Sequence, residues 1–259
     1  MGIQAATPGD TYPLMAKVEV MVIKRMYEEL SPNPIPMFNP IPPFILRDDK
    51  ERMKTGMDPA KTSRGAAFAL WMKSPMPMVT LTKTMDVSRL VRFAKRNGWK
   101  FNMLLCWCVG RAASRIEEFY LLPEGGKLMR YDRLAINVIV PNRQGGINSC
   151  DILFNEDLRQ FNADYLRLTA QVAAACKSEF REEAMVVGTS AMIQTELDSI
   201  VNQYTDLFCN PMVMWGKYRS GFWRTTLPIS FQFHHVQMDG AHAARFLEAL
   251  QGEIRSISC

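Results

Sequence analysis

The sequence lacks long apolar runs and clusters of basic residues, although it extends over 259 residues. A helix that crosses a bilayer needs about 20 consecutive apolar residues, so no membrane-spanning segment is predicted. The formal net charge is only +5, from 31 basic and 26 acidic side chains, and no basic run of the kind that binds nucleic acid stands out. We therefore expect neither a membrane nor a nucleic acid among the partners of this protein.

Cysteine and targeting signals are also sparse. Six cysteines are scattered along the chain without the spacing of a disulfide framework, which indicates reduced thiols. No signal peptide is recognisable. The Met1-Gly2 start resembles a myristoylation signal only until Ala6, where that signal requires Ser or Thr. Together these features predict a cytoplasmic protein.

The first 60 residues differ in composition from the rest of the chain. Apolar residues recur at helical spacing between Leu14 and Leu30, which predicts an amphipathic helix. Residues 31–44 are rich in proline, which excludes both a helix and a central strand and favours an extended, polyproline-like arm. We therefore divide the chain into an N-terminal extension, residues 1–60, and a domain of residues 61–259.

Histidine is rare as well, and all three histidines fall between positions 234 and 242. Residues 227–233 alternate in the manner of a strand, and apolar residues recur at near-helical spacing over 241–250. Asp239-Gly240 supplies the turn between them. Enzymes often place reacting groups at such a strand end, because rigid elements on both sides fix the geometry.

Two simpler explanations fit the same residues. His234 and His235 could be packed polar groups with satisfied hydrogen bonds, or they could bind a metal together with Asp239 and His242. A zinc site usually takes ligands from well-separated segments, and no further histidine exists to supply one. We therefore expect no metal site.

The stretch His234-His235, three variable residues, Asp239-Gly240 and a helix with Ala-Arg-Phe-Leu resembles the signature of the chloramphenicol acetyltransferase family. The resemblance runs almost without a gap from Met214 to Gln251. The wider superfamily also contains the acyltransferase cores of 2-oxo-acid dehydrogenase complexes, which normally carry one histidine before the variable triplet. The double histidine favours the chloramphenicol acetyltransferases.

Two further segments carry the resemblance. The run that begins with Arg64 is similar to the Arg-x-x-His-Phe opening of the family, with Thr62 where the family has a tryptophan. The tetrapeptide that contains Ser190 is similar to the family's Ile-Ser-Ala-Leu, but Ile193 follows it in place of a proline. Met214 stands where the family has a threonine that helps to hold the transition state, which places chloramphenicol itself in question.

The resemblance implies a mechanism and a set of roles. Acyl transfer to a hydroxyl group needs a base, and an imidazole with an unperturbed pKa of about 6.5 suits that task at neutral pH. In the family the second histidine is the base and the first is structural, which corresponds to His235 and His234. The serine that corresponds to Ser190 donates a hydrogen bond to the tetrahedral intermediate. Asp239 pairs with Arg64 and holds the backbone of the site.

The resemblance also implies the architecture. The fold class is α/β, a two-layer sandwich in which helices cover one face of a mixed sheet. The sequence pattern agrees with this, because strands are predicted at 79–86 and 134–140, and helices at 89–97, 101–116 and 155–176. Acyl-CoA and acceptor reach the family's histidine from two sides of a subunit interface, so a homotrimer is expected.

Three functions remain open at this point. The first is a CoA-dependent O-acetyltransferase that uses acetyl-CoA and a small hydroxylated acceptor, which the sequence does not identify. The second is a family member that has lost catalysis and serves as a binding or assembly scaffold, an interpretation favoured by the departures at Thr62, Ile193 and Met214. The third is a 2-oxo-acid dehydrogenase core, which the absence of a lipoyl domain and a long linker makes a poor fit.

Overall fold

The computed structural model describes residues 54–204 and 208–258. The amphipathic helix and the proline-rich arm predicted for residues 14–44 lie outside the described residues. The boundary between extension and domain at residue 60 therefore stays a prediction. Within the described ranges, no helix is both long and apolar enough to cross a membrane.

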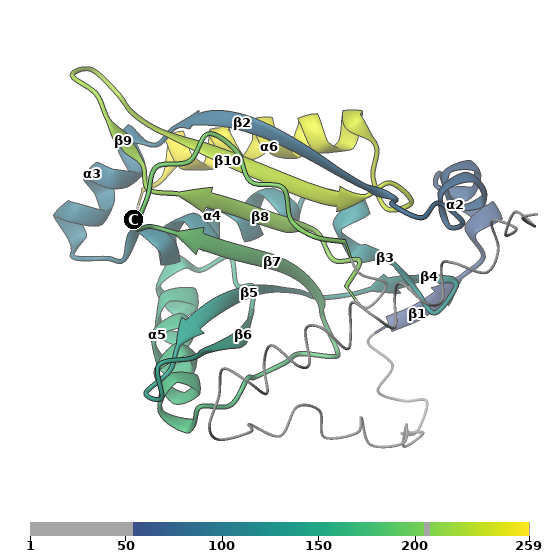
Figure 1. The fold of residues 1–259 in the computed structure, drawn as a ribbon, viewed down its shortest axis with the longest axis horizontal. Coiled ribbons are helices and arrows are strands. Elements are labelled where there is room, and N and C mark those ends of the chain that lie inside the picture. Colours follow the sequence, from purple (N-terminus) through teal and green to yellow (C-terminus); the bar gives the residue numbers. More distant parts are fainter. Residues whose placement is uncertain (1–53, 205–207, 259) are drawn as a thin grey trace, which may run out of the picture. The chain divides into compact units, whose positions relative to one another are not determined.

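Two sheets form the framework of the described part of the chain (Figure 1). The small sheet has the strand order β1-β4-β3 and is antiparallel throughout. Its strands are β1 (Lys54–Met57), β3 (Leu121–Glu124) and β4 (Lys127–Tyr131). The large sheet has the order β2-β10-β8-β7-β5-β6, with the short strand β9 paired to β10. Its strands are β2 (Met78–Asp86), β5 (Leu134–Pro141), β6 (Ile147–Leu153), β7 (Met185–Met192), β8 (Met212–Gly216), β9 (Arg219–Ser220) and β10 (Thr225–His234).

Within residues 54–204 and 208–258, five α-helices and two short 3-10 helices accompany the sheets. They are η2 (Pro59–Lys61), α2 (Gly65–Trp71), α3 (Ser88–Asn97), α4 (Phe101–Ala113), η3 (Glu117–Tyr120), α5 (Leu158–Ala175) and α6 (Gly240–Ser256). Helices α3, α4, α5 and α6 share one apolar core with the large sheet. Helix α2 belongs to a second, smaller apolar cluster beside β3 and β4.

The large sheet is mixed, as predicted. β8, β7 and β5 are parallel neighbours, whereas β2, β10 and β8 are joined by antiparallel pairing, as are β5 and β6. Trp215 on β8 donates its indole N–H to Asn102 on α4, and so marks the face that the helices cover. The predicted α/β sandwich with a mixed sheet is confirmed.

Local sequence explains where the helices begin and end. Helix α3 ends at Gly98, whose φ of 64° is the left-handed conformation that glycine adopts most readily. Helix α5 begins at Leu158 rather than at 155, because the Asp157 side chain accepts hydrogen bonds from the backbone N–H groups of Arg159 and Gln160. Helix α4 ends at Ala113, three residues before the predicted end, and the chain continues into η3.

Candidate active site

The histidine-bearing segment is a strand, a turn and a helix, as predicted. β10 ends at His234, a turn follows, and α6 begins at Gly240. Asp239 caps the helix, since its Oδ1 accepts hydrogen bonds from the backbone N–H groups of Ala241 at 3.0 Å and His242 at 3.3 Å. The turn is thus fixed from both sides by regular structure (Figure 1).

The two adjacent histidines have different surroundings. His234 is only 3% exposed, and its Nδ1 accepts a hydrogen bond from the backbone N–H of Val236 at 3.1 Å. Burial, together with the neighbouring His235, lowers the pKa of His234 to about 4. An imidazole in this state is neutral near pH 7, and its one acceptor nitrogen is occupied by the backbone.

His235 is half-buried and held on several sides. Its ring stacks on the indole of Trp71, with centroids 4.6 Å apart and planes 13° from parallel. Its backbone N–H donates to the carbonyl of Pro77 at 2.8 Å. Nδ1 is buried without a hydrogen-bond partner within the described residues, whereas Nε2 is not among the buried unpartnered atoms. Nε2 is therefore the nitrogen that is open to a substrate.

Arg64 fixes the backbone of the same turn. Its Nη2 donates to the carbonyl of His235 at 2.8 Å, and its Nε donates to the carbonyl of Val236 at 2.9 Å. Its Nη1 forms an ion pair with Oδ2 of Asp239 at 3.1 Å. The Arg64 side chain is 5% exposed and that of Asp239 is 39% exposed, so the pair is buried at one end and open at the other. The structure thus brings Arg64, Asp239 and His235 together.

Through His242, the ion pair is connected to a second carboxylate. His242 lies between two carboxylates, with Nδ1 2.8 Å from Oδ1 of Asp239 and Nε2 2.9 Å from Oε1 of Glu118. Nδ1 is also 3.3 Å from the backbone nitrogen of Asp239, but the carboxylate is closer. Burial by itself would raise the pKa of Asp239, yet hydrogen bonds from His242 and Arg64 and the charge of His242 outweigh it and lower that pKa. Asp239 therefore stays ionised.

Ser190 lies on β7, away from the histidines. The register aligns it with Met214 on β8, and Met214 in turn with Ser230 on β10. Ser190 is therefore two strands away from Ser230, and His235 follows Ser230 by five residues along the chain. With about 4.8 Å between strands and about 3.3 Å per residue, Ser190 and His235 are about 20 Å apart. Within one chain the two side chains cannot contact the same small group.

The side chain of Ser190 points to the sheet face opposite the helices. Its neighbour Thr189 faces the helices, since its Oγ1 is 3.7 Å from Sγ of Cys106 on α4. Ser190 is half-buried and makes no hydrogen bond to any described residue, and its hydroxyl is not among the buried unpartnered atoms. The hydroxyl is therefore free to donate.

A family model for chloramphenicol acetyltransferase matches residues 54–251. The chain belongs to the chloramphenicol acetyltransferase family. Chloramphenicol acetyltransferase 2 from Escherichia coli is 23% identical over 202 residues, which are 76% of this chain and 95% of that protein. Chloramphenicol acetyltransferase 3 from Escherichia coli is 24% identical over 178 residues, which are 66% and 83% of the two chains. The family consists of acyltransferases, and this fixes the broad class of the protein.

Solved structures agree with the fold. A chloramphenicol acetyltransferase superposes with a TM-score of 0.69 at 20% identity, over 78% of this chain and all of that one (100%). A probable dihydrolipoamide acetyltransferase from Listeria monocytogenes has a TM-score of 0.58 at 12% identity, over 79% and 94% of the two chains. At these identities the likeness shows the fold alone.

The departures from the family pattern have distinct positions. Met214 is 2% exposed and is Ser190's partner in the parallel register of β7 and β8, so both side chains are on the same sheet face. Ile193 follows β7 and is 53% exposed. Thr62 donates its hydroxyl to the carbonyl of Pro59 and accepts the N–H of Arg64, which sets the start of α2. Only Met214 lies directly beside a predicted catalytic side chain.

Sequence reasoning missed Trp71, Glu118 and the position of His242 between two carboxylates. A signal for Trp71 exists, because Arg64, Phe68 and Trp71 are spaced by four and three residues and hence share one side of α2. Glu118 carries no comparable signal, since η3 reaches α6 only through packing. Among the described residues, no group of three or more His, Cys, Asp or Glu side chains is arranged to hold a metal ion.

Proposed function

We propose that this protein is a CoA-dependent acyltransferase that moves an acetyl group from acetyl-CoA to a hydroxyl group of a small molecule. The observation that carries the proposal is the state of His235. Its ring is fixed by Trp71, its carbonyl is held by Arg64, and Nε2 is the nitrogen left open. A base that is oriented before substrate arrives loses little entropy in the reaction.

The proposed reaction has one base and no covalent enzyme intermediate. Nε2 of His235 takes the proton of the acceptor hydroxyl while its oxygen attacks the thioester carbonyl carbon. A C–O bond forms and the carbonyl oxygen becomes an oxyanion. When the intermediate collapses, the C–S bond breaks, and the CoA sulfur takes the proton from the imidazolium. The products are an acetyl ester and free CoA, and His235 is again neutral.

Ser190 is the proposed donor to the oxyanion, and this requires a second subunit. The distance of about 20 Å within one chain excludes direct cooperation with the same chain's His235. The free hydroxyl on the sheet face opposite the helices supports a site in which Ser190 of one subunit faces His235 of another. A homotrimer meets this requirement with three equivalent sites.

The remaining side chains of the site have structural roles in this proposal. His234 is buried, neutral and bonded to the backbone of Val236, which suits a residue that shapes the turn. Arg64 and Asp239 hold the same turn from the opposite side. We assign no step of the reaction to these three residues.

An assay of thiol release tests the proposal. The full-length protein is incubated with acetyl-CoA and either chloramphenicol or each member of a panel of other hydroxylated acceptors, and free CoA is measured. We expect acceptor-dependent release that is lost in His235→Ala. Because Met214 replaces a threonine, we expect an acceptor other than chloramphenicol to react fastest. If no acceptor raises release above that of His235→Ala, although acetyl-CoA binds, the protein is a binding scaffold.

A further inference from the structure

The hairpin between β9 and β10 ends in two exposed aromatic side chains. Phe222 is 90% exposed and Trp223 is 87% exposed, more than any other large hydrophobic residue in the described ranges. Their rings contact each other edge to face, with centroids 4.8 Å apart. Figure 1 shows this hairpin projecting beyond the other strands of the large sheet. Two adjacent aromatic side chains that are so exposed to water favour an interaction site.

Helix α3 presents a basic face beside the hairpin. Arg89, Arg92, Lys95 and Arg96 are all exposed, and the helix contains no acidic residue. Three backbone and side-chain contacts fix its position. Val87 N donates to the carbonyl of Thr225 at 2.9 Å, Thr225 N donates to Oγ of Ser88 at 2.8 Å, and Nε of Arg89 donates to the carbonyl of Ile257 at 3.2 Å. The helix is thus tied to the hairpin base and to the end of α6.

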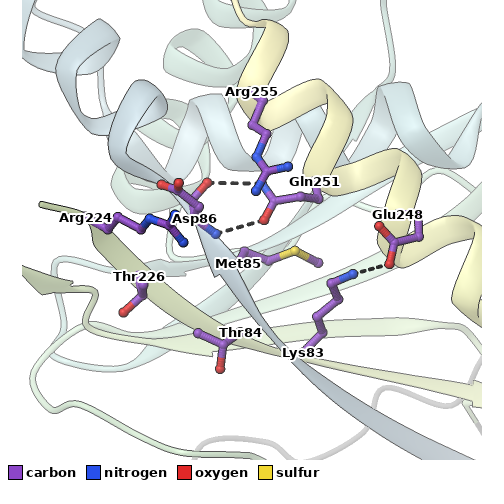
Figure 2. Close-up of a pocket in the computed structure, with 9 residues that line it drawn as sticks. All are labelled: Lys83, Thr84, Met85, Asp86, Arg224, Thr226, Glu248, Gln251 and Arg255. Carbon is purple, nitrogen blue, oxygen red and sulfur yellow. Dashed lines mark hydrogen bonds and ion pairs between the residues drawn. The ribbon is translucent and has the colours of Figure 1, made fainter.

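A cavity of about 400 Å³ adjoins the same hairpin, between β2, the start of β10 and α6 (Figure 2). None of the three histidines lines it. Its lining residues are Lys83, Thr84, Met85, Asp86, Arg224, Thr226, Glu248, Gln251 and Arg255.

The charges in this cavity are not balanced. Lys83 forms an ion pair with Glu248. The side chains of Arg224 and Arg255 are exposed, and neither guanidinium group forms a hydrogen bond or an ion pair with a described residue. Of the two acidic residues that line the cavity, Glu248 is paired with Lys83, so Asp86 is left to the two arginines. Hydrogen bonds from Ser88, and then the charges of Arg224 and Arg255, lower the pKa of Asp86. Two guanidinium groups therefore share one carboxylate.

We propose that this end of the molecule binds the surface of an anionic phospholipid bilayer. We call it the cationic face, and it consists of Arg89, Arg92, Lys95, Arg96, Phe222, Trp223, Arg224 and Arg255. The two aromatic rings enter the interfacial region of the bilayer, where Trp is favoured. The cavity receives a headgroup phosphate at Arg224 and Arg255, and the basic side of α3 lies along the headgroups.

The shape of the face favours a bilayer over a nucleic acid. Bases stack on aromatic rings that line a groove, whereas Phe222 and Trp223 stand on the tip of a projecting hairpin. Composition alone predicts no membrane partner, because the basic residues come from three separate segments and form no run in the sequence. Their clustering is visible only in the fold. The contact is peripheral, and Arg224, which immediately precedes β10, lies ten residues along the strand direction from His234, or about 33 Å.

Vesicle binding tests the proposal with the full-length protein. Vesicles of phosphatidylcholine alone and of phosphatidylcholine mixed with phosphatidylglycerol are sedimented with the protein at low and high salt. We expect binding only to the anionic vesicles, and weaker binding at high salt. Phe222→Ser with Trp223→Ser should reduce binding on the order of tenfold or more. Ile147→Ser is the matched control, because Ile147 is 69% exposed on the far edge strand β6.

Charge and fluorescence supply independent readouts. Arg224→Gln with Arg255→Gln should weaken binding to anionic vesicles, whereas Arg143→Gln, an exposed arginine beyond β5, should not. Tryptophan emission should shift to the blue on binding, and Trp223→Phe should abolish the shift while binding persists. All these positions are exposed, so the variants should keep the wild-type melting temperature.

Three results would overturn the proposal. Equal sedimentation with neutral and anionic vesicles would remove the charge argument. Binding of single-stranded nucleic acid, with none to vesicles, would identify a different polyanion. A change of oligomeric state in the Phe222→Ser, Trp223→Ser variant, without vesicle binding by the wild type, would show that a second copy of the chain covers the tip.

Discussion

The two ends of β10 differ in how many of their polar and aromatic side chains have partners within the described residues. At the C-terminal end of β10, Arg64 donates hydrogen bonds to two successive carbonyls, Trp71 covers one face of His235, and Asp239 caps the next helix. Just before its N-terminal end, Phe222 and Trp223 are exposed, and the guanidinium group of Arg224 has no hydrogen-bond partner within the described ranges. A position held by many contacts suits chemistry that needs fixed geometry. A position with exposed aromatic rings and an unpaired guanidinium group suits binding, because a partner can supply the apolar contacts and the hydrogen-bond acceptors.

Replacing the proposed base should give the largest effect. His235→Ala removes the only imidazole nitrogen of the turn that is open to a substrate, so turnover should fall by about 10²–10⁴-fold or more. His234→Ala should instead lower the melting temperature, because the N–H of Val236 loses its acceptor, while turnover falls far less. His234→Asn, which places an amide oxygen near the position of Nδ1, should recover part of that stability.

Thiol release and thermal unfolding, measured on all three variants, separate the two histidines. Equal losses of turnover in His235→Ala and His234→Ala, with both proteins as stable as the wild type, would contradict the assignment of the base to His235.

The separation of Ser190 from His235 can be tested by mixing subunits. Ser190→Ala should lower kcat by about 10²–10³-fold, the usual effect of losing one oxyanion donor, without a change in melting temperature. When Ser190→Ala and His235→Ala chains are co-expressed, mixed oligomers contain some sites with both wild-type side chains. Their activity should therefore exceed that of either parent by a large factor.

Mixed oligomers provide the decisive comparison, because two inactive parents can complement each other only across an interface. Sedimentation of the wild type should give the mass of a trimer. A fully active monomer, or a mixture no more active than its better parent, would contradict the shared site.

The Arg64–Asp239 pair should give the next largest effect, on stability. Arg64→Met removes the donor to two carbonyls and leaves Asp239 unpaired. Breaking a buried ion pair costs about 3–5 kcal/mol of stability. Because Asp239 is partly exposed, we expect a loss at the lower end, about 3 kcal/mol. Asp239→Asn keeps an acceptor for the helix N–H groups and should cost about 1 kcal/mol. The double variant should lose less than the sum.

Denaturant unfolding of the four proteins measures this coupling, and turnover should fall together with stability because His235 is on the same turn. Strict additivity would show that the ion pair contributes nothing. A loss of turnover in Asp239→Asn without any loss of stability would instead indicate a direct catalytic role for this carboxylate.

The sequence predicts the local structure around these residues well, for physical reasons. Alternation over 227–233 and helical spacing over 241–250 are set by which side chains face the core, and both elements form. Gly98 ends α3 because its backbone conformation is intrinsic to glycine. In contrast, the apolar pattern continues to Ile116, which is buried although α4 has already ended at Ala113. Burial is the property that such patterns encode.

Contacts between distant segments were less predictable. The pairing of Arg64 with Asp239 followed only from resemblance to a family, and Glu118 meets His242 through packing of η3 against α6. The cationic face could not be predicted from composition, because its basic residues are dispersed in the sequence. The distance between Ser190 and His235 likewise depends on the strand order, which local patterns do not determine.

The predicted effect that is smallest at neutral pH is a dependence of stability on pH that arises from His234. The folded protein holds the pKa of this imidazole at about 4, below its ordinary value of 6.5, because burial disfavours the charged form. Between these two values the unfolded chain binds a proton that the folded chain does not. The contribution of His234 is therefore complete above about pH 6.5 and is lost as the pH falls towards 4, with a slope of at most about 1.4 kcal/mol per pH unit.

Carboxylates titrate in part of the same range, so the comparison must be with a variant. His234→Asn does not titrate there, and denaturant unfolding at several pH values between 7 and 4.5 should show a shallower loss of stability for it. Parallel curves for the wild type and His234→Asn would mean that His234 is protonated in the folded state, and the closed, desolvated environment assigned to this end of β10 would then be wrong.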